Sequence, residues 1–430
     1  MYRHYHAYVT IGAWCGLILA LNACNNNALE VSAVGSNRGT TPFMGDGSNP
    51  SSGLIQGRDG SFYGTTAAGG QFNEGTVYRI TPDGDETVLY SFAGGVSDGA
   101  DPSGALIESS DGNFYGTTIG GGVGQCPGPE PVSYNGPPPP CGTVFEVTPE
   151  GGEAVLHYFS GTTDGGQPTG GLLQGSNGSF YGTTDEGTGT VFTITPAGDE
   201  TVLYSFPEPG SNGSIPSSLV QGTDGDFYGT TDIGGSSTYG TIFQITPAGT
   251  ETVLHSFNGG TDGELPSAAL VVGSDGNFYG TTPFGGLSAN PAPICDRGCG
   301  TVFMITPTGV ETVLYAFAGG TADGANPYGA LIQASDGNFY GTTGSGGMAN
   351  CGVGCGTVFK ITPTGVETVL YAFAGGNTDG ASPSSVVQGS DGNFYGTTAA
   401  GGEFNAGTVF KITPAGVETV LHSFGGATTP

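Results

Sequence analysis

The chain has 430 residues and is strongly acidic, with 37 Asp and Glu against 7 Lys and Arg and a formal net charge of −30. Binding to nucleic acid requires clustered Lys and Arg side chains that neutralise phosphates, so this composition excludes a nucleic-acid-binding protein. The same charge disfavours electrostatic attachment to anionic lipid. The 85 Gly and 28 Pro residues would suit a low-complexity chain, but the 24 Phe and 19 Tyr recur at fixed places and indicate a repeated core.

The first 24 residues have the pattern of an export signal. Arg3 precedes an apolar run from Val9 to Leu21, which is shorter than the roughly 20 residues of a permanent membrane span. The run ends in Leu-Asn-Ala-Cys, which resembles the lipobox of bacterial lipoproteins, in which the Cys is lipidated. We therefore expect residues 1–23 to be a signal peptide, Cys24 to carry the lipid, and the protein to reach the outer membrane or cell surface. An ordinary secretory peptide is the alternative.

Residues 24–47 are rich in Asn, Ser, Gly and Thr, which predicts a flexible tether after the lipidated Cys. The end of this segment has a second pattern. Phe43 to Pro50 echoes the segment that precedes each later repeat, for example Phe317 to Pro327. Part of the tether is therefore expected to be ordered.

From residue 48 onward the chain consists of seven similar units. Each contains the phrase Phe-Tyr-Gly-Thr-Thr, which begins at Phe62, Phe114, Phe180, Phe227, Phe278, Phe339 and Phe394. Each unit has four runs of four to eight residues, rich in Val, Ile, Phe, Tyr and Thr and bounded by Gly, Pro or Asp-Gly, a pattern that predicts β-strands. Asp-Gly or Asn-Gly between the first two runs and Pro-x-Gly between the last two predict tight hairpins.

Seven units of four antiparallel strands predict an all-β, seven-bladed β-propeller over residues 48–430. A β-helix and two stacked sandwiches explain the length and number of the units less well. The units run in order from Pro50 to Phe424, so the ring can close without a blade shared between the chain ends. Alternatively, the segment around Thr40 to Met44 adds to the last blade and locks it.

The strand order also predicts two different faces. Both tight turns of every unit lie on one face, while the second-to-third loops and the blade-to-blade segments lie on the other. The second-to-third loops have 8, 23, 4, 8, 17, 12 and 8 residues in units one to seven. Because variable loops on a rigid scaffold commonly carry function, we expect the binding surface on that face.

The motifs Asp-Gly-Asn-Phe-Tyr-Gly-Thr-Thr and Gly-Thr-Val-Phe-Lys-Ile-Thr-Pro resemble those of the GloVer tandem-repeat family, from Pro50 to about Phe424. That resemblance implies an exported bacterial protein with one of several surface anchors, among them a lipoprotein signal. It implies no particular activity.

The histidines offer little support for catalysis. After residue 23 the chain has only His157, His255 and His422, and all three occupy a strand position that is Tyr in the other four units. A residue that alternates with Tyr in a repeat is expected to be structural.

Six cysteines form three pairs, each within one second-to-third loop: Cys126 with Cys141, Cys295 with Cys299, and Cys351 with Cys355. In an exported protein this spacing predicts three local disulfides. Zinc is the alternative, but each loop offers two Cys and no His, whereas a structural zinc site has four ligands.

An aspartate followed by Gly recurs in the blade-to-blade segments. These residues are Asp46, Asp98, Asp164, Asp262, Asp323 and Asp379. If they surround the opening of the axial channel, they could hold Ca²⁺, which takes six to eight oxygen ligands. Asp-Gly is also an ordinary turn dipeptide, and none of these loops has the spaced acids of a known calcium motif. We assign no metal and no other cofactor.

The sequence leaves three candidate functions. The leading prediction is a monomeric, non-enzymatic binding propeller that holds a polysaccharide or protein on its long loops, where Tyr134, Tyr239 and Phe284 are candidate aromatic contacts. The second is a hydrolase or lyase acting on extracellular glycan, with a carboxylate pair drawn from Asp98, Asp101, Asp262 and Glu264. The third is a purely structural envelope protein.

Overall fold

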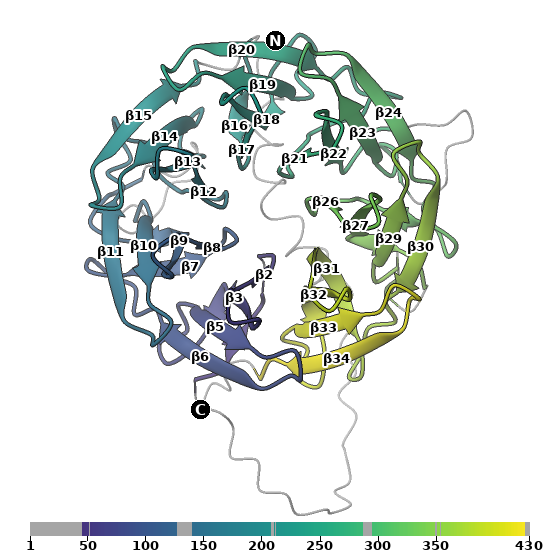
Figure 1. Cartoon of the computed structure of the whole chain (residues 1–430), viewed down its shortest axis with the longest axis horizontal. Helices are drawn as coiled ribbons and strands as arrows, with labels where there is room; N and C mark the ends of the chain where they lie inside the picture. Colours follow the sequence, from purple (N-terminus) through teal and green to yellow (C-terminus); the bar gives the residue numbers. More distant parts are fainter. Residues whose placement is uncertain are drawn as a thin grey trace, which may run out of the picture.

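The computed structural model describes residues 45–50, 52–126, 140–207, 210, 212–286, 295–348, 351–352 and 354–425. These residues form seven small antiparallel sheets arranged around one axis (Figure 1), so the predicted seven-bladed propeller is confirmed and the β-helix and the sandwiches are wrong. The proposed signal peptide, Cys24 and the tether as far as residue 44 lie outside the described residues. No helix within the described ranges is long and apolar enough to cross a membrane.

Each blade takes its strands from one repeat, and the four strands follow one another from the axis to the rim. Blade 1 consists of β2 (Ile55–Gln56), β3 (Phe62–Thr66), β5 (Thr76–Ile80) and β6 (Glu86–Ser91). The next three blades are β8 (Ile107–Glu108), β9 (Phe114–Gly121), β10 (Thr143–Val147) and β11 (Glu153–Tyr158); β12 (Leu173–Gln174), β13 (Phe180–Thr184), β14 (Thr190–Ile194) and β15 (Glu200–Ser205); and β17 (Val220–Gln221), β18 (Phe227–Ile233), β19 (Thr241–Ile245) and β20 (Glu251–Ser256).

Blades 5 to 7 repeat this order: β21 (Val271–Val272), β22 (Phe278–Thr282), β23 (Thr301–Ile305) and β24 (Glu311–Ala316); β26 (Ile332–Gln333), β27 (Phe339–Thr343), β29 (Thr357–Ile361) and β30 (Glu367–Ala372); and β31 (Gly380–Gln388), β32 (Phe394–Gly401), β33 (Thr408–Ile412) and β34 (Glu418–Ser423). In several blades a short strand of the segment that enters the blade pairs with that blade near its second-to-third loop: β1 (Gly47–Ser48) pairs with β4 (Ala68–Gly69), β7 (Gly99–Pro102) with β9, β16 (Ser214–Pro216) with β18, and β25 (Gly324–Ala325) with β28 (Ser345–Gly346).

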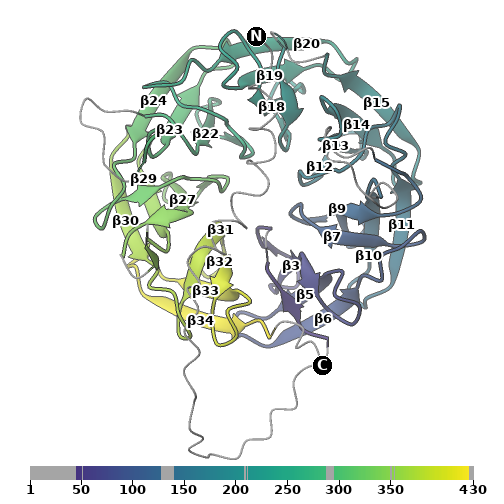
Figure 2. The ribbon, with the colours of Figure 1, turned by 180° about the vertical axis from the view of Figure 1, so that it is seen from behind.

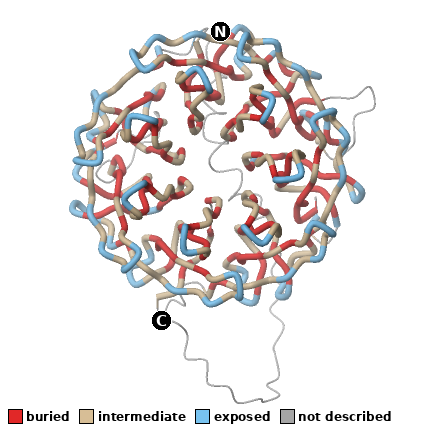
Figure 3. Tube along the Cα trace, in the orientation of Figure 1, coloured by how far each residue is buried: buried red, intermediate tan, exposed pale blue. Residues whose placement is uncertain are grey.

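The phrase Phe-Tyr-Gly-Thr-Thr forms the second strand of every blade and is buried throughout. Its Tyr stacks on the Phe of the next blade, as Tyr63 does on Phe114 with a centroid distance of 4.0 Å. The Gly makes room for the third strand, because a Cβ atom on Gly116 would lie 2.6 Å from the ring of Phe145. Figure 3 shows the resulting band of buried residues inside an outermost strand of intermediate exposure.

The ring closes without a shared blade, because blades 1 and 7 each contain strands of one repeat only. Phe62 stacks on Tyr395 across the closure at 4.0 Å, in the manner of the other blade contacts. The N-terminal segment also takes the place of the blade-to-blade segment that would follow β34. The backbone N–H of Gly425 donates to Asp46 Oδ2 at 2.7 Å, and that of Asn49 donates to the Ala406 carbonyl at 2.8 Å. The proposed lock at Thr40 to Met44 lies outside the described residues.

The strand order places the tight turns on one face and the long connections on the other, as predicted. Figures 1 and 2 view the two sides of the ring. We call the surface formed by the second-to-third loops and the blade-to-blade segments the long-loop face, and the opposite surface the tight-turn face.

One residue in each blade-to-blade segment has a left-handed backbone. These residues have φ between 53° and 60° and directly precede a Pro: Asn49, Asp101, Gln167, Ile215, Leu265, Asn326 and Ser382. In each case the backbone N–H donates to a carbonyl of the loop in the preceding blade, as Ile215 N does to Thr188 O at 3.1 Å. Asn tolerates this conformation, whereas a β-branched residue is strained in it.

We expect Ile215→Asn to stabilise the protein by about 1 kcal/mol, because Asn relieves the strain of a β-branched residue at positive φ. The free energy of unfolding in urea measures the effect. Ile215→Val, which keeps the β-branch, is the control and should give no gain. Equal stability of the Asn and Val variants would contradict the explanation.

Candidate functional site

The six aspartates of the blade-to-blade segments lie at the outer rim, and the prediction that they surround an axial opening is wrong. Asp98 Oδ2 accepts hydrogen bonds from the hydroxyl of Tyr90, in the outermost strand β6, at 2.9 Å and from the backbone N–H of Ala93 at 2.6 Å. Its Oδ1 accepts from the backbone N–H of Gly99 at 2.6 Å. The physical reason is that each segment leaves the outermost strand and forms its Asp-Gly turn before it returns toward the axis.

These carboxylates therefore do not share one ion. Asp323 and Asp379 repeat the three contacts of Asp98, each with a Tyr of its own blade and two backbone N–H groups. These Asp residues are thus each held by hydrogen bonds at separate positions on the rim. This arrangement removes the geometric basis for the predicted Ca²⁺ ring.

Each Asp belongs instead to a three-residue cluster that we call a junction. A junction consists of the acid or amide of the segment, the Tyr or His of the outermost strand before it, and the Glu that begins the outermost strand of the next blade. The seven junctions are Asp98–Tyr90–Glu153, Asp164–His157–Glu200, Asn212–Tyr204–Glu251, Asp262–His255–Glu311, Asp323–Tyr315–Glu367, Asp379–Tyr371–Glu418 and Asp46–His422–Glu86. The last one joins the two ends of the described chain.

The junction glutamates were missed by the sequence reasoning, although one stands at the same strand position in every unit. Burial raises the pKa of six of them to about 7: Glu86, Glu153, Glu200, Glu311, Glu367 and Glu418. The nearby aspartate adds to the shift, as Asp98 does for Glu153. The Oε1 atom of every junction glutamate is buried and has no hydrogen-bond partner among the described residues.

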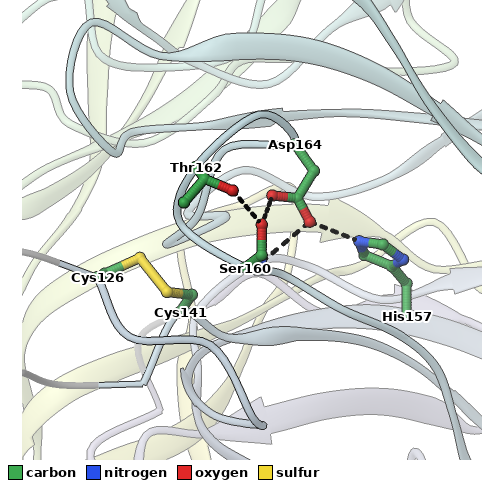
Figure 4. The surroundings of a disulfide bond; sticks show 6 residues. All are labelled: Cys126, Cys141, His157, Ser160, Thr162 and Asp164. Carbon is green, nitrogen blue, oxygen red and sulfur yellow. Dashed lines mark hydrogen bonds and ion pairs between the residues drawn. A yellow bond between two sulfur atoms is a disulfide. The ribbon is translucent and has the colours of Figure 1, made fainter.

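The three histidines lie in the Tyr position of their junctions, as the repeat alignment predicts. Each packs its ring edge-on against the Phe two residues later, as His157 does against Phe159 at 4.9 Å. His157 Nε2 lies 3.3 Å from Asp164 Oδ2, while Ser160 donates to the same carboxylate through its hydroxyl and its backbone N–H (Figure 4).

The three predicted disulfides are present: Cys126–Cys141, Cys295–Cys299 and Cys351–Cys355. Each packs against a Gly that follows the outermost strand of its own blade. A Cβ atom on Gly161, Gly319 or Gly375 would approach the paired sulfurs to within 2.6 to 3.4 Å. The disulfides thus fix the loops of blades 2, 5 and 6 to the rim of the long-loop face.

The four carboxylates considered for glycan hydrolysis fall into two pairs on opposite sides of the ring. Asp98 and Asp101 lie between blades 1 and 2, whereas Asp262 and Glu264 lie between blades 4 and 5, across the ring in Figure 1. Glu264 is committed to a salt bridge with Arg297. Glycoside hydrolysis needs two carboxyl groups about 5 to 10 Å apart, which residues two or three positions apart can provide, but in each pair one carboxylate, Asp98 or Glu264, is already held by groups of the protein.

A cluster that does not repeat lies on the long-loop face of blades 5 and 6. Arg297 lies over the ring of Phe284, 4.7 Å from its centroid, and its Nε donates to Glu264 Oε2 at 3.1 Å. Tyr328 meets Phe284 edge-on at 6.3 Å. The strand register places Ala or Gly opposite each other at the Glu264 and Phe284 positions of blades 2 and 7. We call Phe284, Arg297, Tyr328 and Glu264 the aromatic cluster.

The other candidate aromatic residues do not extend this cluster. Tyr239 packs against the core between blades 4 and 5, and Tyr134 lies outside the described residues. The sequence indicated only part of this cluster: Phe284 was a candidate contact, and Arg297 stands out as one of only seven basic residues.

A hollow of about 350 Å³ opens on the tight-turn face between blades 7 and 1, and Asp59, Asp391 and Tyr395 line it. Partial burial opposes ionisation of Asp391, but hydrogen bonds from Asn393, Tyr395 and Lys411 outweigh it and hold the pKa of Asp391 below its usual range. Since the Asp–Tyr pair recurs in other blades, for example Asp336 with Tyr340, we interpret this hollow as part of the scaffold.

The protein should lose stability as the pH rises from 5 to 8. Folding raises the pKa of Glu153, Glu367 and Glu418 from 4.5 to about 7, so the folded state binds more protons in this range and ionisation penalises it. Partial burial lowers the pKa of His157, and this single shift acts on stability in the opposite direction.

The midpoint of thermal unfolding against pH, measured with a chelator present, checks this dependence. The triple variant Glu153→Gln, Glu367→Gln and Glu418→Gln mimics the protonated side chains and should flatten the slope. An unchanged slope in the triple variant would show that other groups dominate.

Removing the Cys126–Cys141 disulfide should cost more stability than removing Cys351–Cys355. The first bond spans 15 residues and the second spans 4, for which chain entropy gives about 3 and about 2 kcal/mol respectively. Urea unfolding of the two double Cys→Ala variants measures the difference. The reverse order of stability would exclude loop closure as the main contribution.

Comparison with solved structures shows likeness at the level of the fold. A putative 6-phosphogluconolactonase from Bacteroides uniformis is 15% identical and has a TM-score of 0.51, with coverage of 86% of this chain and 95% of that one. Hydrazine synthase from Kuenenia stuttgartiensis is 15% identical, with a TM-score of 0.52 and coverage of 87% and 98%. A puromycin-hydrolyzing peptidase from Mycobacterium tuberculosis is 11% identical, with a TM-score of 0.52 and coverage of 91% and 58%.

These identities are too low to transfer any activity, and the three named proteins differ in what they do. No curated protein sequence matches the chain. The model of the Gloeobacter/Verrucomicrobia repeat matches residues 25–127, 132–353 and 294–430, almost the whole chain after the predicted signal peptide. The chain therefore belongs to the Gloeobacter/Verrucomicrobia repeat family.

Proposed function

We propose that this protein is a non-enzymatic binding propeller that holds a neutral polysaccharide on its long-loop face. The observation that supports this proposal is the aromatic cluster, in which Phe284 and Tyr328 lie beside the charged pair of Arg297 and Glu264. Aromatic rings pack against the apolar faces of sugar rings, while the neighbouring polar groups bond to hydroxyls.

The exposure of the cluster suits contact with a ligand. Tyr328 is 38% exposed and the Arg297 side chain 45% exposed, whereas Glu264 is almost fully buried and holds the guanidinium in place. Two further rings, Phe72 and Phe404, are 51% and 56% exposed in the equivalent loops of the neighbouring blades 1 and 7. The long-loop face therefore offers separate aromatic contacts, an arrangement that suits an extended polymer.

The charge of the chain narrows the class of ligand. With a formal net charge of −30 and only seven basic residues, the protein repels anionic polymers. The junction carboxylates are distributed around the rim and their aspartates are engaged in local hydrogen bonds, which favours binding over hydrolysis. A neutral polysaccharide fits both observations.

We further propose that the protein is located at the outer membrane or cell surface. Three disulfides are compatible with an oxidising compartment, and the Leu-Asn-Ala-Cys sequence ending at Cys24 resembles a lipidation signal. A lipid on Cys24 would hold the propeller at the outer membrane or cell surface, where extracellular polysaccharide is accessible.

Tyr328→Ala should weaken binding of a neutral polysaccharide about tenfold, because loss of one aromatic contact of about 1.4 kcal/mol changes affinity by that factor. A screen of the full-length protein on a glycan array identifies the polysaccharide, and titration calorimetry compares the variant with the parent protein. Val310→Ala is the control, since Val310 is 61% exposed in a tight turn on the opposite face.

The proposal fails if the array gives no glycan binding. It also fails if neither Tyr328→Ala nor shortening of the loops of blades 2 and 5 changes the measured affinity. Equal weakening by the Val310 control would place the contact on the tight-turn face.

A further inference from the structure

Two of the three His-containing junctions bring three metal-ligating groups together. In one, Asp46, Glu86 and His422 each offer an atom, and all three atoms lie within 4.8 Å of one another. In the other, His255, Asp262 and Glu311 do the same. The Nε2 atom lies 3.4 Å from the aspartate Oδ2 in both.

The Tyr-containing junctions differ from these two His-containing junctions in how the ring contacts the aspartate. At Asp98, Asp323 and Asp379 the Tyr hydroxyl donates a hydrogen bond to the aspartate at 2.9 to 3.0 Å. At the two His junctions, by contrast, the buried His255 Nε2 and His422 Nε2 face their aspartates at ion-pair distance but make no hydrogen bond among the described residues. A buried polar atom without a partner calls for an explanation such as a bound ion.

The third His junction provides an internal comparison. His157 Nε2 is hydrogen-bonded to Asp164, and both oxygens of that carboxylate are also engaged by Ser160. At the positions equivalent to Ser160, Asn258 and Gly425 contact their aspartates through the backbone N–H. His157 and Asp164 are thus engaged within the protein, and together with Glu200 they do not form a cluster of the same kind among the described residues.

We propose that the Asp46–Glu86–His422 and His255–Asp262–Glu311 junctions each bind one divalent transition-metal ion, for which Zn²⁺ is the probe. One imidazole with two carboxylates is a donor set that suits zinc and its neighbours, whereas Ca²⁺ prefers oxygen ligands alone. Ligands on a tetrahedral Zn²⁺ lie about 3.3 Å apart, close to the 3.4 Å between His Nε2 and Asp Oδ2. The glutamate completes a three-residue site by a small side-chain rotation, and water fills the remaining position.

The two ions would have different structural effects. Glu86 belongs to blade 1 and His422 to blade 7, while Asp46 lies in the N-terminal segment, so an ion held by all three fastens the ring at its closure. The ion at His255, Asp262 and Glu311 joins blades 4 and 5, which the chain already connects. Metal bound at the first site should therefore contribute more to the stability of the ring.

The experiment is titration of chelator-treated full-length protein with Zn²⁺, followed by calorimetry and by the midpoint of thermal unfolding. We expect two saturable sites in the parent protein, one in His422→Tyr, one in His255→Tyr and none in the double variant. Tyr is the appropriate replacement because four junctions already contain it, so the fold is retained. His157→Tyr is the matched control and should keep both sites.

Zn²⁺ should raise the unfolding midpoint of the parent protein, raise it less in His422→Tyr than in His255→Tyr, and leave the double variant unchanged. Zn²⁺ also binds weakly to the acidic surface of the parent protein and of every variant. The double variant measures this background. The proposal is overturned if the parent protein shows no saturable binding, or if the number of sites is the same in the parent and the double variant.

Discussion

The stacked Phe–Tyr contact between neighbouring blades is the interaction on which the ring depends. Every blade supplies both rings from adjacent residues of its second strand, and the seven centroid distances fall between 4.0 and 4.3 Å. Alternation along a strand directs the two rings to opposite faces of the sheet, so each blade contacts both neighbours. The following Gly admits the aromatic ring of the third strand. A five-residue phrase thus determines the spacing of the blades, and the same contact between Phe62 and Tyr395 closes the ring.

Much of this fold could be predicted from the sequence, because the interactions that build it are local or repeated. Strand alternation and turn dipeptides define each hairpin, and seven copies of one unit define the closed ring. The disulfides were predictable because both cysteines of each pair lie in one loop. The position of the aspartates was not, because Asp98 and its relatives follow the outermost strand, and only the path of the segment determines whether they lie at the axis or the rim. The aromatic cluster was predictable only in part, since Phe284, Arg297 and Tyr328 come from separate segments.

The ends of the chain show why the closure needs more than the stacked rings. In the six covalent connections the aspartate, or Asn212 in one of them, follows its outermost strand within the same segment, whereas after β34 the aspartate is Asp46, from the other end of the chain. Its hydrogen bonds to Gly425 and the N–H group of Gly47 reproduce the pattern that Asp98 makes within one segment. The closure therefore repeats the geometry of a covalent link without the covalent bond, and this is the one junction at which the two chain ends can separate.

A repeated position is usually assigned to the scaffold, and the junctions show the limit of that rule. Tyr and His fill the same space and make the same edge-on contact with the neighbouring Phe, as Tyr90 and His422 do at 5.1 and 4.8 Å. The phenol, however, donates a hydrogen bond to the aspartate, whereas a neutral imidazole offers a lone pair that metal ions bind. The substitution leaves the packing unchanged and alters the chemistry. In a repeat protein, a new site can therefore arise at a scaffold position without disturbing the fold. Such a site can be recognised by polar atoms for which the scaffold provides no hydrogen-bond partner.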